Sequence, residues 1–342
     1  NIATDGGLPR GRIVIIVGME SVGKSGFVYN EIANWQRRLG LPSVIVDWED
    51  SAYSERLTAY GVDESEVIIL RPDTMEEGLD SVIYMAMEHE LGIIAVDSIA
   101  LMSHSKEQLL KDGSLAGLNR DEVAEKARMV NKFCRKLHGS LNRAMSSNRI
   151  PPTIILVQQW YVSEIATWGV MRGMSGGSGQ KYASHLTIDL RAPSKTDGGS
   201  AIYDRIEDEN GKEQLVKCGI RVRWNVIKSK VSPDGREGFY EMFTIPAVGG
   251  LVQPGVRRSM EAMQYGVKYG VIHKSGGWFT YEDTKINGKE LFEAELWKDK
   301  ELLAKIEQDY HRWAEDIDER PAPDQPAILQ ALLSIAASSS HL

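Results

Sequence analysis

The chain has 342 residues, of which 42% are hydrophobic and 26% are charged, as is typical of a folded protein with one large and one small domain. It contains no apolar run near the ~20 residues of a membrane span, and no basic-then-apolar leader, so we expect no membrane association and a cytoplasmic location. The net charge of −8 argues against general nucleic-acid binding, although local patches decide phosphate binding. Cys134 and Cys218 lack metal or disulfide spacing and are expected to be reduced thiols.

The first motif is a strand, a glycine-rich turn and a helix. The apolar run Ile13 to Val17 predicts a buried strand, and a helix is expected from Gly26 to about Arg38. Between them lies the G-x4-G-K-[ST] spacing of a phosphate-binding loop, in which backbone N–H groups, a lysine charge and a Mg²⁺-ligating hydroxyl meet a phosphate. A glycine turn without a ligand is the less favoured alternative. The candidate residues are Gly18, Glu20, Ser21, Val22, Gly23, Lys24, Ser25 and Gly26.

The second predicted strand, residues 43–47, ends in the acidic run Asp47-Trp-Glu49-Asp50. Carboxylates just past the carboxyl end of a parallel strand lie where α/β sheets bind ligands. A carboxylate at this position is a candidate for orienting and deprotonating the water that attacks the γ-phosphate. The alternative is an acidic loop or a helix N-cap. A helix over residues 52–60, a strand over 67–70 and a helix from Met75 to about Glu90, capped by Thr74, follow.

A further apolar strand, residues 91–98, closes with Asp97. A strand ending in aspartate is common by itself, but after a phosphate loop it predicts the carboxylate that holds Mg²⁺ through its water shell. Residues 103–120 are polar and glycine-bearing and predict a loop, and the apolar spacing over residues 121–146 predicts a core-facing helix.

The strand predicted over residues 153–157 ends in Gln158-Gln159, and an amide there is a candidate sensor of the γ-phosphate. A long glycine-rich stretch with large aromatic side chains follows. Exposed aromatics beside basic groups suit stacking on a single nucleic-acid strand, whereas the alternatives are a loop folded on its own aromatics or a protein interface. The candidate DNA-binding residues are Trp160, Trp168, Met171, Arg172, Gly176 and Gly177.

Strands are predicted over residues 183–191 and 215–227, and the polar stretch 193–213 between them is expected to be a hairpin loop. Lys228 and Lys230 share one face of the strand end, and a solvated edge is the alternative to a functional pair. We expect a domain boundary near residues 249–254, where the pattern breaks.

The order of these motifs resembles that of the RecA family of recombinases, and the later part of the core looks most like the phage UvsX-type branch. The resemblance runs from Gly7 to about Ile317. The small C-terminal domain is suggested by Gly266-Val-Lys-Tyr-Gly and Gly276-Gly-Trp-Phe-Thr-Tyr281. The most specific motifs are Gly18–Ser25, Asp47-Trp-Glu49, Pro72-Asp-Thr74, Val96-Asp-Ser98, Gln158-Gln159, Gly176-Gly-Ser-Gly179 with Tyr182-Ala-Ser184, and Lys228-Ser-Lys230.

The resemblance implies a role for each matching position. Glu49 matches the glutamate that activates water, and Gln159 matches the glutamine that couples the γ-phosphate to the second DNA-binding loop. Lys228 and Lys230 match a pair that reaches the ATP of the adjacent subunit. Arg56 stands where the family has an adenine-stacking tyrosine and Tyr53 lies three positions away, so either is a candidate for the base.

The implied fold is a RecA-like P-loop α/β core with a mostly parallel central sheet and a small C-terminal α/β domain. Residues 1–252 would form the core, with DNA-binding loops near 103–120 and 160–180, residues 253–317 the small domain, and 318–342 a linker and tail. The family carries an N-terminal helix and strand that build the filament, whereas only ten residues precede Gly11, and we expect a trimmed start.

The implied activity is that of a DNA-dependent ATPase using ATP and Mg²⁺. It would coat single-stranded DNA as a helical filament and promote pairing and strand exchange with duplex DNA in recombination and repair. Single-strand-binding and loader proteins are the implied partners, in a bacterial or phage-infected cytosol. The rival functions are another RecA-fold motor, such as a helicase or regulatory ATPase, and a DNA-binding assembly module without catalysis.

Overall fold

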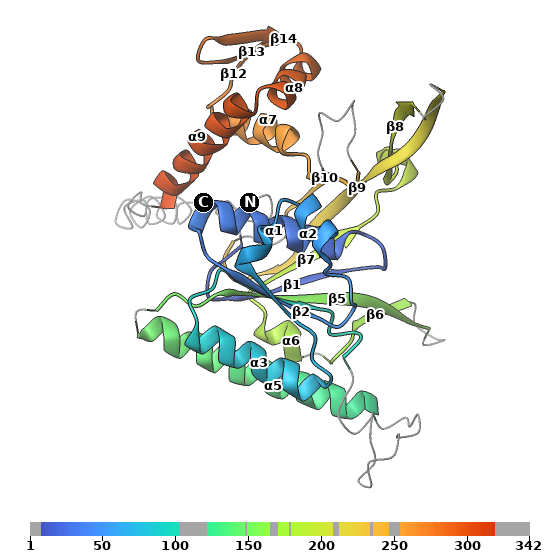
Figure 1. Ribbon diagram of the computed structural model, residues 1–342, viewed down its shortest axis with the longest axis vertical. Coiled ribbons are helices and arrows are strands. Elements are labelled where there is room, and N and C mark those ends of the chain that lie inside the picture. The colour runs from blue at the N-terminus through green and yellow to red at the C-terminus, as the bar shows by residue number, and fades with distance from the viewer. Residues whose placement is uncertain are drawn as a thin grey trace, which may run out of the picture. The chain divides into compact units, whose positions relative to one another are not determined.

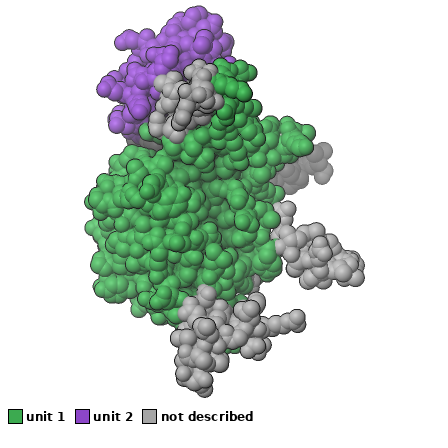
Figure 2. All heavy atoms as spheres, turned by 45° about the vertical axis from the view of Figure 1, so that its right-hand side comes forward, with its two compact units in different colours: residues 1–258 green, residues 259–342 purple. Residues whose placement is uncertain are grey.

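The computed structural model describes residues 8–102, 122–147, 149–164, 170–177, 179–207, 212–232, 235–245 and 254–318. The chain divides into two compact units, residues 1–258 and residues 259–342, which Figure 2 colours separately. None of the described helices is both long enough and apolar enough to cross a membrane.

The first unit is built on one large sheet with helices on both faces (Figure 1). The strand order along the main path is β11-β10-β9-β7-β1-β5-β4-β2-β3. The stretch from β7 to β3 is parallel, and β9, β10 and β11 continue the sheet in antiparallel pairs. The strands on this path are β1 (Ile13–Gly18), β2 (Ser43–Asp47), β3 (Val67–Leu70), β4 (Ile93–Asp97), β5 (Thr153–Glu164), β7 (Leu186–Arg191), β9 (Glu213–Ser229), β10 (Glu237–Phe243) and β11 (Gly255–Val256).

The central strand β1 is buried along its whole length because helices cover both faces of the sheet. Its alternate side chains enter two different cores: Val14 and Ile16 pack with α1 (Lys24–Leu39) and α2 (Ser54–Ala59), while Ile13, Ile15 and Val17 pack with α3 (Met75–Glu88) and α5 (Glu122–Ser146). Figure 1 shows these two helix pairs on opposite sides of the sheet. The parallel sheet therefore directs the carboxyl ends of β1, β2, β4 and β5 to one edge.

The predicted RecA-like α/β core is confirmed, but two segments differ from expectation. The stretch 193–213, expected to be a loop, contains a short 3-10 helix (Lys195–Asp197) and the strand β8 (Ala201–Glu207), which pairs antiparallel with β9. The side chains of this stretch show no apolar alternation, and the strand forms because β9 supplies its backbone hydrogen-bond partners.

The other difference concerns the stretch that follows Gln159. Strand β5 continues to Glu164 and pairs antiparallel with β6 (Val170–Met174). The segment expected to be a loop therefore contains the two paired strands of a hairpin. Backbone pairing such as Trp160 with Met174 satisfies main-chain groups that an irregular loop would leave to solvent. Residues 103–120, expected to be the other loop, lie outside the described residues.

The second unit holds its own small core. A three-stranded antiparallel sheet, separate from the large one, packs with helices around Phe279, Phe292 and Ile306, all buried. Helix α9 runs to Asp318, the first residue of the segment expected to be a linker and tail. The elements are α7 (Arg258–Lys268), β12 (His273–Ser275), β13 (Trp278–Tyr281), β14 (Thr284–Asn287), α8 (Lys289–Lys298) and α9 (Lys300–Asp318).

Candidate functional site

The glycine-rich turn joins β1 directly to α1, as its spacing predicts. Gly23, at the N-cap of α1, has φ +94°, a conformation that glycine adopts at little cost, and Ser21 has φ +58°. A Cβ on Gly18 would lie 2.6 Å from the carbonyl oxygen of Leu190, so only glycine fits where the turn leaves the sheet.

No side chain caps the N-terminus of α1, and its first turn carries no acidic residue. The first N–H groups of a helix lack partners within the helix, so they present donors and a positive dipole end. Lys24, the first residue of α1, donates from Nζ to the carbonyl oxygen of Met19 at 2.8 Å. Donors and a cation therefore gather at the same turn.

Asp97 ends β4 beside Asp47, which ends the neighbouring strand β2 in register. The Asp97 side chain is 1% exposed, and neither of its oxygens has a hydrogen-bond partner of standard geometry among the described residues. Burial raises the pKa of Asp97 to about 6, with Glu49 and Asp47 adding to the shift and the Ser25 hydroxyl and Lys24 ammonium opposing it. A buried carboxylate without partners, beside a serine hydroxyl, fits a divalent cation such as Mg²⁺.

Glu49 lies in the exposed turn that follows β2, and its Oε1 accepts a hydrogen bond of 2.7 Å from Ser98 Oγ. Ser98 directly follows Asp97, so two strand ends meet through this contact. Burial lowers the pKa of Lys24, and the charges of Glu49, Asp97 and Glu20 act against that shift. The structure thus brings a lysine and two acids from three strand ends into electrostatic contact.

Gln158 and Gln159 lie on opposite faces of β5, as neighbouring strand residues must. Gln159 pairs in register with Gly18, the first residue of the phosphate loop, and is partly buried. Gln158 is fully buried, and its amide donates to the carbonyl oxygen of Ser175 at 3.1 Å and to Gln180 Oε1 at 2.5 Å. The two amides therefore have different surroundings: Gln159 lies beside the phosphate loop, and Gln158 anchors the turn after β6.

The candidate DNA-binding residues fall into three groups. Trp160 is partly buried, and its Nε1 donates to Asp189 Oδ1 at 2.7 Å, so the expectation of a freely exposed ring is wrong for this residue. It fails because β5 continues through Trp160 and places its ring against the core beside α5. Gly176 and Gly177 have φ +80° and +78° and lie close to α5. Trp168 lies outside the described residues, and only the backbone of Met171 and Arg172, in β6, is described.

Lys228 and Lys230 both contact backbone carbonyls at the end of the short helix α6 (Gly179–Ala183). Lys228 donates to the carbonyl oxygens of Lys181 and, at 2.8 Å, of Ser184, and Lys230 donates to that of Tyr182 at 2.9 Å. Burial, followed by the charge of Lys230, lowers the pKa of Lys228 to about 8. The pair is thus held against its own chain, with its ammonium groups on partial negative charges.

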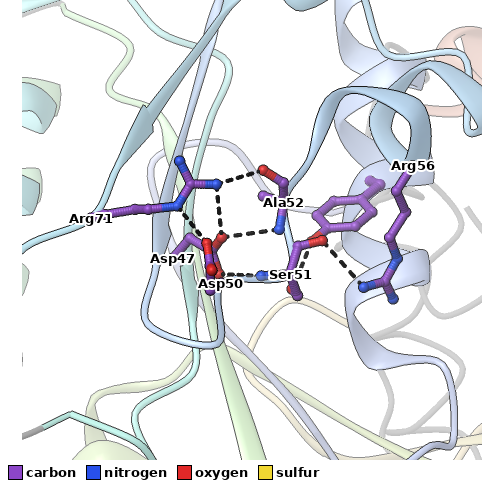
Figure 3. A network of polar contacts seen from close by, with 7 residues as sticks. Asp47, Asp50, Ser51, Ala52, Arg56 and Arg71 are labelled. Atoms are coloured by element: carbon purple, nitrogen blue, oxygen red, sulfur yellow. Dashed lines mark hydrogen bonds and ion pairs between the residues drawn. The ribbon is translucent and has the colours of Figure 1, made fainter.

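The two candidates for contact with a base differ in their surroundings. Tyr53, the N-cap of α2, is 54% exposed. Arg56 lies with its guanidinium 5.3 Å from the centre of the Tyr29 ring, and its Nη1 donates to the carbonyl oxygen of Ser51 at 3.3 Å (Figure 3). Of the two candidates, Tyr53 presents an exposed aromatic ring, whereas Arg56 is engaged with Tyr29 and Ser51.

Sequence reasoning placed Ser98 in the Val96-Asp-Ser98 motif without giving it a role, and it did not single out Asp189, Gln180 or Arg71. Ser98 was within reach, because it follows the aspartate of a recognised strand. Asp189 meets Trp160, Gln180 meets Gln158, and Arg71 meets the turn after β2. These contacts join segments that are distant in sequence, so no local signal marks them.

The fold and the site together define an α/β protein with a phosphate-binding loop at the carboxyl edge of a mostly parallel sheet. The family model described as the RecA N-terminal domain matches residues 1–244, and that of the RecA C-terminal domain matches residues 260–312. The chain belongs to the RecA family.

Among its relatives are proteins named Protein RecA. That of Sulfurimonas denitrificans is 30% identical over 89% of this chain and 78% of its own length. That of Ruegeria pomeroyi is 29% identical over 95% of this chain and 84% of its own, and that of Mycolicibacterium smegmatis is 29% identical over 89% and 77%.

Proposed function

We propose that this protein is a DNA-dependent ATPase that assembles on single-stranded DNA as a filament and promotes pairing and strand exchange with duplex DNA. The observation that carries the proposal is the meeting of Lys24, Glu49 and Asp97 at one edge of the sheet, in a chain that matches both RecA domain models. Recombination and repair are the processes such an activity serves.

The phosphate loop and the N-terminus of α1 would hold the triphosphate, with Lys24 turning from the Met19 carbonyl to the outer phosphates. Ser25 and Asp97 are the residues that would hold Mg²⁺, which when bound neutralises charge on the phosphates. Glu49, held by Ser98, would orient the attacking water and accept its proton. Tyr53 would stack on the base, since Arg56 is engaged with Tyr29.

Gln159 would report the γ-phosphate to the hairpin formed by β5 and β6, which carries the proposed DNA contacts. Lys228 and Lys230 would complete the ATP site of the next copy in the filament, where added positive charge stabilises the transition state. Their contacts with the end of α6 would then be exchanged for contacts with phosphate. Single-strand-binding and loader proteins are the further partners of such a filament.

Within the family we propose that the chain lies nearest the phage UvsX-type branch, which the later part of its core resembles most. We also propose the functional division into residues 1–252, 253–317 and 318–342.

The test is ATP turnover with and without single-stranded DNA, in the wild type and in variants. Lys24→Ala is expected to weaken nucleotide binding and abolish turnover. Glu49→Gln is expected to bind ATP normally and to reduce kcat by roughly 10²-fold or more, because it loses the proton acceptor while keeping the shape. Glu55→Gln, an exposed glutamate of α2, is the matched control and is expected to behave as wild type.

The rival functions predict different results. Normal turnover in Glu49→Gln would reject this residue as the base and favour Asp47 or Asp50. No turnover by the wild type in either condition would favour an assembly module without catalysis. Turnover without filaments in electron micrographs, with single-stranded DNA and a slowly hydrolysed ATP analogue, would favour a motor of another kind.

A further inference from the structure

The turn that carries Glu49 is closed by the carboxylate at the end of β2. Asp47 Oδ2 accepts from the backbone N–H of Ala52 at 2.9 Å, and its Oδ1 accepts from that of Ser51 at 3.2 Å. Asp47 is 3% exposed, so this carboxylate is fixed within the sheet edge. Its two hydrogen bonds fold residues 47–52 into a loop with Glu49 near its middle.

Arg71 holds the same turn from the outside (Figure 3). It directly follows β3, the neighbour of β2 at the end of the sheet. Its Nε lies 2.9 Å from Asp50 Oδ1, and its Nη2 donates to the carbonyl oxygen of Ala52 at 2.9 Å and lies 3.7 Å from Asp47 Oδ2. A single guanidinium therefore contacts three points of the turn, two of them on the carboxylates that flank Glu49 in sequence.

The contact with Asp50 fixes a backbone conformation that aspartate adopts only at a cost. Asp50 has φ +48°, in the left-handed region, which is unfavourable for residues with a Cβ. Its side chain is 85% exposed and that of Arg71 50% exposed, and ion pairs so exposed contribute little to global stability. The value of the contact is therefore local: it selects one conformation of the turn.

Both the carboxylate and the backbone of Glu49 are therefore held in place. Ser98 binds its carboxylate, and Arg71, through Asp50, Ala52 and Asp47, fixes the backbone from which the side chain projects. Lysine is a poor substitute for Arg71, because the three contacts use the planar fork of the guanidinium and an ammonium cannot span them.

We propose that Arg71 is a positioning residue for Glu49. It keeps the carboxylate in line with the phosphate loop without touching the substrate. The inference rests on the proposed function, since the role of Glu49 as the base belongs to that proposal. The inference gives Arg71, which lies outside the family motifs recognised in the sequence, a role in positioning Glu49.

The kinetic test compares Arg71→Ala, Arg71→Lys, Asp50→Ala and the double variant Arg71→Ala/Asp50→Ala. We expect Arg71→Ala to reduce kcat by about ten- to a hundredfold while the Kd for ATP changes by less than about threefold, since misplacement of a catalytic group lowers rate rather than binding. The double variant is expected to be little worse than Arg71→Ala, because Arg71→Ala already removes the contact with Asp50 together with those to Ala52 and Asp47. Arg143→Ala, an exposed arginine of α5, is the matched control.

A structural readout is amide hydrogen exchange in the nucleotide-free protein. The N–H groups of Ser51 and Ala52 are bonded to Asp47 in the turn, so the peptide spanning residues 47–53 is expected to exchange faster in Arg71→Ala. Arg143→Ala is expected to leave that peptide unchanged. Arg71→Lys is expected to fall between the wild type and Arg71→Ala in both exchange and kcat.

Unchanged kcat in Arg71→Ala, or a Kd for ATP weakened in proportion to kcat/KM, would overturn the proposal; so would exchange in residues 47–53 equal to that of the wild type. If Arg71→Ala does not fold, Arg71→Lys and Asp50→Ala carry the test. If Glu49→Gln hydrolyses ATP as fast as the wild type, the proposed role of Glu49 is refuted, and this inference is refuted with it. Turnover that depends on Glu49 but not on Arg71 would refute the positioning role alone.

Discussion

Three charged side chains dominate the site at the scale of single residues, and each is held in a different way. Lys24 is held by a carbonyl of its own turn, Glu49 by the hydroxyl of Ser98, and Asp97 is buried beside the Ser25 hydroxyl and the Lys24 ammonium. A buried carboxylate without hydrogen-bond partners is unfavourable unless a cation is bound. This arrangement supports the proposed binding of Mg²⁺ and a triphosphate at this edge of the sheet.

A second residue-scale feature gives a prediction about pH. His185 is 8% exposed and stacks on His138 with ring centres 5.5 Å apart. Burial, and then the positive charges of Arg12, Lys230, His138 and Lys228, lower its pKa to about 4. Below pH ~6.5 the unfolded chain takes up a proton at this histidine while the folded chain does not, so stability falls as the pH drops from about 6.5 to about 4.

We expect the contribution of His185 to the free energy of unfolding to fall by about 1–3 kcal/mol across that range. His185→Gln is expected to reduce the pH slope, measured by urea unfolding at several pH values. His273→Gln, an exposed histidine of the second unit, is expected to retain it. A slope in His185→Gln equal to that of the wild type would contradict the prediction.

At the scale of elements, the turn after β2 is packed as well as hydrogen bonded. Trp48, the residue before Glu49, lies against α3 at Gly78. A Cβ on Gly78 would lie 2.3 Å from the Trp48 ring and 2.7 Å from Pro72 Cγ, so the close approach of turn and helix requires glycine. Gly78 thus permits the contact that packs the turn of Glu49 against α3.

Gly78→Ala is expected to destabilise the protein by about 1–3 kcal/mol, although alanine is the better helix former, because the clash outweighs the propensity gain of about 1 kcal/mol. Denaturant unfolding measures the change. Gly139→Ala is the matched control: it lies in α5, a Cβ there meets nothing within 4 Å, and we expect no loss of stability. In a Trp48→Leu background the cost of Gly78→Ala is expected to shrink, and an equal cost in both backgrounds would reject the packing argument.

At the scale of the whole molecule, the proposed filament makes each ATP site depend on two copies of the chain. Lys24 and the lysines at 228 and 230 would then act on the same triphosphate from different protomers. In an isolated copy the two lysines contact the carbonyls that end α6. If the two lysines act on the ATP site of a neighbouring copy, two inactive variants should complement each other when they are mixed.

Lys24→Ala and Lys228→Ala are each expected to show little DNA-stimulated turnover alone. In an equal mixture, about one interface in four would combine an intact phosphate loop with an intact Lys228 from its neighbour, as random head-to-tail assembly requires. We expect turnover near a quarter of the wild-type value. A mixture no more active than its components would show that Lys228 acts within its own chain.

The local features of this protein were predictable because each depends on a short run of contiguous residues. The strand-turn-helix around Lys24, the strand ending in Asp97 and the helix capped by Thr74 all depend on spacing and on short-range backbone geometry, and the structure contains each of them. The same reasoning missed β8, because a polar strand is stabilised by its partner β9 and not by its own pattern.

The sequence by itself therefore determined the phosphate loop, the fold class and the family. Only the tertiary structure decided which side chains meet: Ser98 with Glu49, Gln158 with Gln180, and Arg71 with the turn after β2. These contacts join residues 19 to 49 positions apart, and they depend on strand order and register. Because long-range pairing sets both, a pattern of neighbouring residues can name the parts of the site but not their contacts.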